Sequence, residues 1–283
     1  MLLRSVYLSI VVSMTVAGAI ARNSESFFGE AFCRPANTAE FSVEPVTPGE
    51  GGIKEDVPIK YRSRFEKWKA ELLSTSFGRA EWERYANRKD FILTIKVTND
   101  RGKGAGTDKF RWDHNGNFIG ATITLGSDID QGYPTPVYYP VLNSLSSNDT
   151  IYSVSGPILA ATKISHEIGH VNQTALSNAK LLELQERLMP QYIAIFLKNG
   201  LNTKDNKLLE LADQMGGTPV ELWERREYGS EVNAMNYLSE RLGNEEFYCD
   251  VLNRIRENLT SYARKYEQMF DKDLRTNGAR CGK

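Results

Sequence analysis

The sequence has few of the residues that most often bind metals or form disulfides. Its 283 residues include only 3 histidines and 3 cysteines. Cys33, Cys249 and Cys281 are far apart, whereas a cysteine-ligated metal site uses pairs of cysteines at close spacing. We therefore expect no such site. Three cysteines also allow at most one disulfide within the chain, so one thiol stays free or pairs outside it.

Long runs of lysine or arginine are absent as well. The formal net charge is −1, and 41% of the residues are hydrophobic. This composition is ordinary for a globular protein with one sizeable core or two small lobes. It excludes the basic groove of a nucleic-acid-binding protein and a basic patch for acidic membranes, so we expect no nucleic-acid partner. It does not predict an oligomeric state.

The first 21 residues have the pattern of a signal peptide. Arg4 supplies a positive charge, Ser5–Ala21 is almost uncharged and mostly apolar, and Ala19-Ile20-Ala21 matches a cleavage site. An uncleaved anchor is the alternative, but the apolar run is slightly shorter than the roughly 20 residues of a spanning helix. We expect an exported protein, secreted or periplasmic, with no membrane span after cleavage.

The rest of the chain predicts an α+β fold, with strands first and helices second. The proline- and glycine-rich residues 22–60 indicate an extended arm or linker before a domain over 61–270 and a tail over 271–283. We expect helices near 61–74 and 79–88, a strand over 91–98, and a hairpin whose turn is Asp113–Gly116. A polar loop over 126–156 precedes a helical half over 157–270.

The central motif is His166-Glu167-Ile168-Gly169-His170. Two histidines four residues apart lie about 40° apart around a helix, so both rings can reach one ion. The glutamate between them points to the side of the pair, where it can hold a water molecule instead of the metal. The motif therefore predicts one catalytic zinc ion with His166 and His170 as ligands and Glu167 as general base.

The surrounding residues predict a helix with two distinct faces. Pro157 fits the first helical turn, and an apolar stripe then repeats every three or four residues. The stripe consists of Ala161, Ile164, Ile168, Val171 and Ala175. The histidines project from the opposite side, towards a cleft. Gly169, between them, permits a neighbouring group to approach closely, at a cost of about 1 kcal/mol relative to alanine.

A catalytic zinc site needs a third protein ligand. The pattern with a third histidine six residues after the second is excluded, because Leu176 stands at that place. We therefore expect a carboxylate from a later helix.

The best candidate helix begins at Thr218-Pro219 and carries Glu224, Glu227 and Glu231 on an otherwise apolar face. A carboxylate buried on such a face needs a partner, and a metal ion is a suitable one. We expect Glu231 to be the ligand, because the apolar residues Ala234, Met235 and Leu238 follow it on the same face. Glu227 is the alternative.

With these residues the sequence resembles the zincin metallopeptidases, and among them the gluzincins. Those enzymes pair a helix bearing His-Glu-x-x-His with a later helix bearing a glutamate ligand. The matching residues here are His166–His170 and Glu231-Val232-Asn233-Ala234, within a region of about 91–242. The resemblance implies a small mixed or antiparallel sheet, an active-site helix and a helical C-terminal half.

The resemblance also implies further site residues. Zincins often stabilise the oxyanion with a tyrosine or histidine near the ligand helix, which suggests Tyr228, with His114 as the alternative donor. They also bind extended substrate along an edge strand of the sheet. By resemblance that strand comprises Ala121, Thr122, Ile123 and Thr124, whose backbone would pair with a peptide unless the strand is interior.

These features predict a zinc-dependent peptidase that acts on peptides or proteins. Three alternatives remain open at this point. They are a zincin-like binding module without activity, an amidase with a non-peptide substrate, and a secreted effector that cleaves one particular protein.

Overall fold

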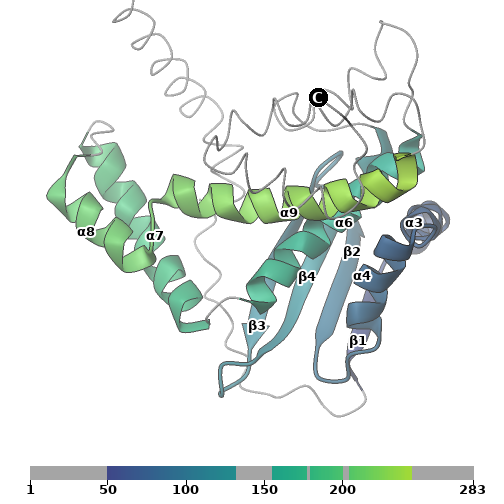
Figure 1. The fold of residues 1–283 in the computed structure, drawn as a ribbon, viewed down its shortest axis with the longest axis horizontal. Coiled ribbons are helices and arrows are strands. Elements are labelled where there is room, and N and C mark those ends of the chain that lie inside the picture. Colours follow the sequence, from purple (N-terminus) through teal and green to yellow (C-terminus); the bar gives the residue numbers. More distant parts are fainter. Residues whose placement is uncertain (1–49, 132–154, 177–178, 200–203, 244–283) are drawn as a thin grey trace, which may run out of the picture. The chain divides into compact units, whose positions relative to one another are not determined.

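The computed structural model describes residues 50–131, 155–176, 179–199 and 204–243. Within them the chain forms a four-stranded sheet and six α-helices, which is the α+β arrangement that the sequence predicts (Figure 1). The predicted signal peptide over 1–21, the three cysteines and the predicted tail over 271–283 lie outside the described residues.

The sheet consists of β1 (Gly52–Asp56), β2 (Ile92–Thr98), β3 (Ala105–Trp112) and β4 (Phe118–Gly126). Their spatial order is β1-β2-β4-β3, with β1 and β4 parallel to β2 and β3 antiparallel to β4. The β3–β4 hairpin turns where expected. The Asp113 carboxylate accepts hydrogen bonds from the backbone N–H groups of Asn115 and Asn117, and Gly116 adopts a φ of 79°.

Strand β1 corrects the predicted boundary of the domain. It falls within 22–60, where the sequence suggests an arm or linker, yet it pairs in register with β2 from Gly52 to Asp56. Five residues flanked by prolines and glycines are too short to stand out as a strand. The domain therefore begins before residue 61.

The helices are α3 (Ile59–Leu72), α4 (Ser76–Ala86), α6 (Gly156–Ala175), α7 (Ala179–Lys198), α8 (Asn206–Met215) and α9 (Pro219–Leu242), with a 3₁₀ turn η2 (Ile129–Gln131). Helix α9 starts where the sequence predicts. Thr218 and Glu221 form a reciprocal capping box, and Pro219 occupies the first turn. Helix α4 receives a cap from α9, because the Glu240 carboxylate accepts from the backbone N–H groups of Ser76 and Phe77 at 2.6 and 2.7 Å.

Helix α6 lies at the centre of the domain. It packs on β3 and β4 and also contacts α3, α4 and α9, and Figure 1 shows α9 crossing it. Of its predicted apolar stripe, Ala161, Ile164, Ile168 and Val171 are fully buried, whereas Ala175 is exposed. They pack in the main core with inward-facing side chains of β2 and β4, including Leu93, Ile95, Ile123 and Leu125.

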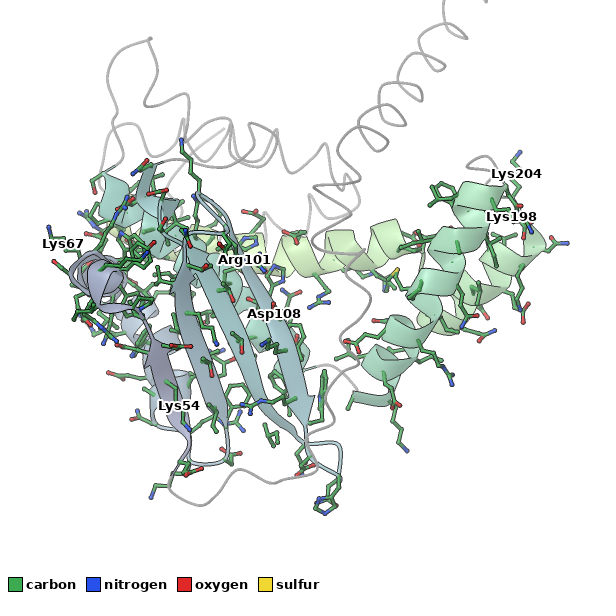
Figure 2. The ribbon with its side chains drawn as sticks, turned by 180° about the vertical axis from the view of Figure 1, so that it is seen from behind. Lys54, Lys67, Arg101, Asp108, Lys198 and Lys204 are labelled. Carbon is green, nitrogen blue, oxygen red and sulfur yellow. The ribbon has the colours of Figure 1, made fainter. Side chains whose placement is uncertain are left out.

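The opposite face of the sheet is polar. Along β2, buried Leu93, Ile95 and Val97 alternate with the partly exposed side chains of Thr94, Lys96 and Thr98. Figure 2 shows this face with Lys54 on β1 and Asp108 on β3. Only one face of the sheet therefore belongs to the main core, and it is the face that carries α6.

A second, smaller core forms where α7 and α8 meet the first turn of α9. Its buried residues are Leu188, Tyr192, Leu208, Leu211, Ala212, Met215 and Leu222. In the part of the chain that the structure describes, no helix is both long and apolar enough to cross a bilayer.

Candidate metal centre

Helices α6 and α9 approach each other closely at Gly169. A Cβ atom built on this glycine would lie 2.7 Å from Cα of Ser230 and 3.0 Å from Cβ of Asn233. No larger side chain fits there without moving a helix. The expectation that Gly169 permits close approach is confirmed, and the neighbour is the backbone of α9.

Hydrogen bonds between the two helices hold this crossing in place. The Asn233 amide donates to the backbone oxygen of Ser165 at 2.6 Å, and the Ser165 hydroxyl donates to the backbone oxygen of Asn233 at 3.0 Å. About two turns further along α6, the Gln173 amide donates to the backbone oxygen of Arg226 at 2.8 Å. These bonds fix the rotation and the axial position of α9 against α6, and with them the side chains that face each other.

Two histidines of α6 and one glutamate of α9 converge at the crossing. Nε2 of His166 lies 3.4 Å from one carboxylate oxygen of Glu227, and Nε2 of His170 lies 3.6 Å from the other. The two imidazole rings meet edge to face with centroids 4.9 Å apart. In the described part of the chain, these three residues form a group whose donor atoms can share one metal ion.

The spacing of these atoms is compatible with one shared ion. Ligands about 2.0–2.2 Å from a tetrahedral zinc ion lie about 3.4 Å from one another. The 3.4 and 3.6 Å separations are similar to this value, and they involve different oxygens of Glu227. Two imidazoles and a carboxylate are also a common donor set for zinc.

Glu231, the expected third ligand, occupies a different place. Its side chain is only 4% exposed, as predicted for the deepest glutamate of the face, but it faces the other ring nitrogen of His166, with Nδ1 and Oε1 3.5 Å apart. A metal-binding histidine commonly has a carboxylate near its second nitrogen, which orients the ring. The geometry therefore favours the alternative, Glu227, as ligand and gives Glu231 the orienting position.

Burial and neighbouring charges together determine the protonation of His166, His170 and Glu227. Burial lowers the pKa of His170 to about 3, so this ring is neutral at neutral pH, and its buried Nδ1 has no hydrogen-bond partner among the described residues. Burial raises the pKa of Glu227, but the neighbouring histidines outweigh it and bring that pKa to about 2. Neutral imidazole and ionised carboxylate are the forms that bind metals.

His166 behaves differently from His170. Burial lowers its pKa, but the carboxylates of Glu231 and Glu227 outweigh burial and raise the pKa to about 10. His166 therefore carries a proton at neutral pH, and a metal cation must displace that proton to bind.

Glu167, the expected general base, is buried beside strand β3. The hydroxyl of Thr107 donates to its carboxylate at 2.7 Å. Burial raises the pKa of Glu167, while the charge of His166 and the Thr107 hydrogen bond oppose this rise. The carboxylate thus lies within electrostatic reach of His166 and Glu227, and its pKa is moved in the direction that suits proton transfer near neutral pH.

The predicted substrate strand is wrong in its position. Ala121, Thr122, Ile123 and Thr124 belong to β4, whose backbone pairs with β2 on one side and with β3 on the other. An interior strand has no free edge for a peptide, so the alternative of an interior strand is confirmed. The edge strand on this side is β3. The composition of the two strands indicates which one is the edge, because β3 carries charged residues typical of an edge strand and β4 carries none.

The edge strand is held against α6 by a buried lysine. Lys163 donates from Nζ to the backbone oxygens of Lys103 and Ile129 at 2.8 and 3.0 Å. Lys103 lies in the turn before β3, so this contact and the Thr107–Glu167 bond secure the first half of the strand beside α6. Sequence reasoning missed both Thr107 and Lys163, because neither belongs to a motif and both act through tertiary contacts.

The two proposed oxyanion donors lie in unlike surroundings. Tyr228 is half-buried and packs against the main core. His114 is exposed in the turn between β3 and β4. The role of either as an oxyanion donor stays a prediction.

Comparisons with protein-family models, curated proteins and solved structures found no match to this chain.

Proposed function

We propose that this protein is a zinc-dependent peptidase with a gluzincin-like site. The observation that carries the proposal is the convergence of His166, His170 and Glu227 within reach of one ion, with buried Glu167 beside His166 in the sequence. These three residues would hold one zinc ion, and Glu231 would orient His166. A zinc ion bound there supplies the Lewis acidity that activates water and polarises a carbonyl group.

The remaining chemistry belongs to side chains of the chain itself. Glu167 takes the proton of the attacking water and passes it to the leaving amine. Its raised pKa favours the second of these steps, and the hydrogen bond from Thr107 favours the ionised form needed for the first. Thr107 also holds the carboxylate towards the edge strand, which is the side from which a peptide would enter.

A peptide substrate would bind along β3. This strand pairs only with β4 among the described strands, and it carries Thr107, the residue that contacts Glu167. Addition of a strand at a free edge uses backbone hydrogen bonds and therefore accepts many sequences. The predicted signal peptide supports export, so we propose a secreted or periplasmic site of action.

Peptide cleavage by the zinc-loaded protein tests this function. We expect mass spectrometry of a mixed peptide library to find new termini that disappear after chelation and return with zinc. Glu167→Gln is the control, because it should keep the metal ligands but lower kcat/KM by about 10² to 10⁴-fold. A zinc-loaded wild-type protein that cleaves no peptide, or a Glu167→Gln variant that cleaves as fast as wild type, would contradict the proposal.

A further inference from the structure

Arg226 precedes the metal-binding glutamate and reaches from α9 to the edge strand. Its guanidinium lies over the ring of Phe110 on β3, 5.3 Å from the ring centroid. Phe110 is itself held by packing against Trp112 and Phe118, with ring centroids 6.3 and 6.1 Å away. A cation stacked on an aromatic face has a defined position. The guanidinium of Arg226 thus lies beside β3, next to the candidate metal centre.

This charge is available to a ligand. Arg226 is exposed, although desolvation by the atoms around it lowers the pKa of its guanidinium, and within the described part of the chain it makes no ion pair. The two carboxylates close enough to influence its pKa are Glu227 and Glu186. Glu227 turns both its oxygens towards the histidines. An arginine in this state suits the carboxylate of a bound molecule, because its planar fork pairs with two oxygens.

The register of β3 relates this charge to a bound peptide. Phe110 lies three residues after Thr107, which contacts Glu167, and a bulge at Lys109, with a φ of 50°, lies between them. The two residues are therefore at most about 10 Å apart along the strand. A peptide that pairs antiparallel to β3 runs towards its own N-terminus from Thr107 to Phe110. We propose that Arg226 makes the enzyme select substrates with Asp or Glu two or three residues before the cleaved bond. The inference rests on the proposed function for its position in the substrate.

Binding to an inactive protein tests the inference without catalysis. The probes are two fluorescein-labelled pools of random peptides, identical except that every Glu in one is Gln in the other. We expect the zinc-loaded Glu167→Gln protein to bind the Glu pool about fivefold to tenfold more tightly. Adding Arg226→Gln should remove this preference. Adding Arg225→Gln should keep it, because Arg225 is the same residue type but donates to the backbone oxygen of Gly216.

Equal binding of the two pools, or a preference that survives Arg226→Gln, would overturn the inference. The library cleavage experiment separates this result from a failure of the proposed function. Cleavage without enrichment of Asp or Glu at the second and third residues before the cleaved bonds contradicts the role of Arg226 alone. A binding preference without any cleavage contradicts the peptidase and supports Arg226 as the residue that recognises acidic peptides.

Discussion

Replacing Gly169 by alanine tests how the packing of α6 and α9 positions the candidate metal ligands. The new Cβ would lie 2.7 Å from Cα of Ser230, whereas ordinary contact begins at 3.4 Å. Helix α9 must therefore move by about 0.7 Å, because the atom it meets is backbone and cannot rotate away. Glu227 lies on the same helix, three residues before Ser230, so the movement separates its carboxylate from the two histidines.

Two opposing effects decide the stability of this variant. Alanine is favoured over glycine within a helix by about 1 kcal/mol. Overpacking costs about 1–3 kcal/mol, and each cross-helix hydrogen bond weakened by the movement costs about 1 kcal/mol more. We expect a net destabilisation of about 1–3 kcal/mol. Zinc affinity should fall by about tenfold to hundredfold, since ligand distances tolerate only about ±0.2 Å.

Urea unfolding in the presence of chelator and competitive zinc titration measure the two effects separately. Gly229→Ala is the matched control on the other helix of the same crossing. The atoms nearest to its Cβ would belong to the side chain of Gln173, which can rotate at the cost of its hydrogen bond to Arg226, so we expect a smaller change in both quantities. If Gly169→Ala binds zinc like wild type and gains the stability expected from helix propensity, close approach at Gly169 does not determine the site.

Three further predictions concern the hydrogen bond between Thr107 and Glu167, the proton on His166 and the cap of helix α4. Thr107→Val should lower kcat by about tenfold or more without changing zinc affinity, and Thr107→Ser should restore kcat. The hydrogen bond lost in Thr107→Val favours the ionised form of Glu167. The acidic limb of the pH profile of kcat/KM should therefore also move to higher pH in that variant. Zinc binding at pH 7 should release about one proton, because the pKa of His166 is raised to about 10, and zinc affinity should therefore rise with pH. Calorimetry in buffers of different ionisation enthalpy measures the number of protons released. A binding enthalpy that does not depend on the buffer would refute the prediction. Glu240→Gln should cost about 1 kcal/mol at pH 7 by weakening the cap of α4. Burial raises the pKa of Glu240, but its hydrogen bonds outweigh burial and lower that pKa. The stabilisation by Glu240 is therefore present at pH values above the pKa of the unfolded state and is lost as the pH falls. Equal stability of the variant and wild type at pH 7 would be the contrary result.

Local features of the fold were predictable because short sequences encode them. The capping box at Thr218, the turn at Gly116 and the apolar stripe of α6 each depend on residues within one or two turns of the chain. The same is true of the spacing of His166, Glu167 and His170. These features set the bounds of the helices and place both histidines on one side of α6.

Features that depend on how distant elements pack were not predictable. Glu227 and Glu231 lie one helical turn apart on the same face of α9, so periodicity alone cannot tell which of them meets Nε2 of the histidines. The answer depends on the axial position of α9, which the contacts at Gly169 and Asn233 determine. The order of β3 and β4 in the sheet likewise depends on long-range pairing.

Anomalous diffraction at the zinc absorption edge, from crystals of the zinc-loaded protein, tests the central claim most directly. The account predicts one strong peak within about 2.0–2.2 Å of His166 Nε2, His170 Nε2 and a carboxylate oxygen of Glu227, with Glu231 outside the coordination sphere. A peak that is coordinated by Glu231 in place of Glu227, or the lack of any peak at these histidines, would contradict it.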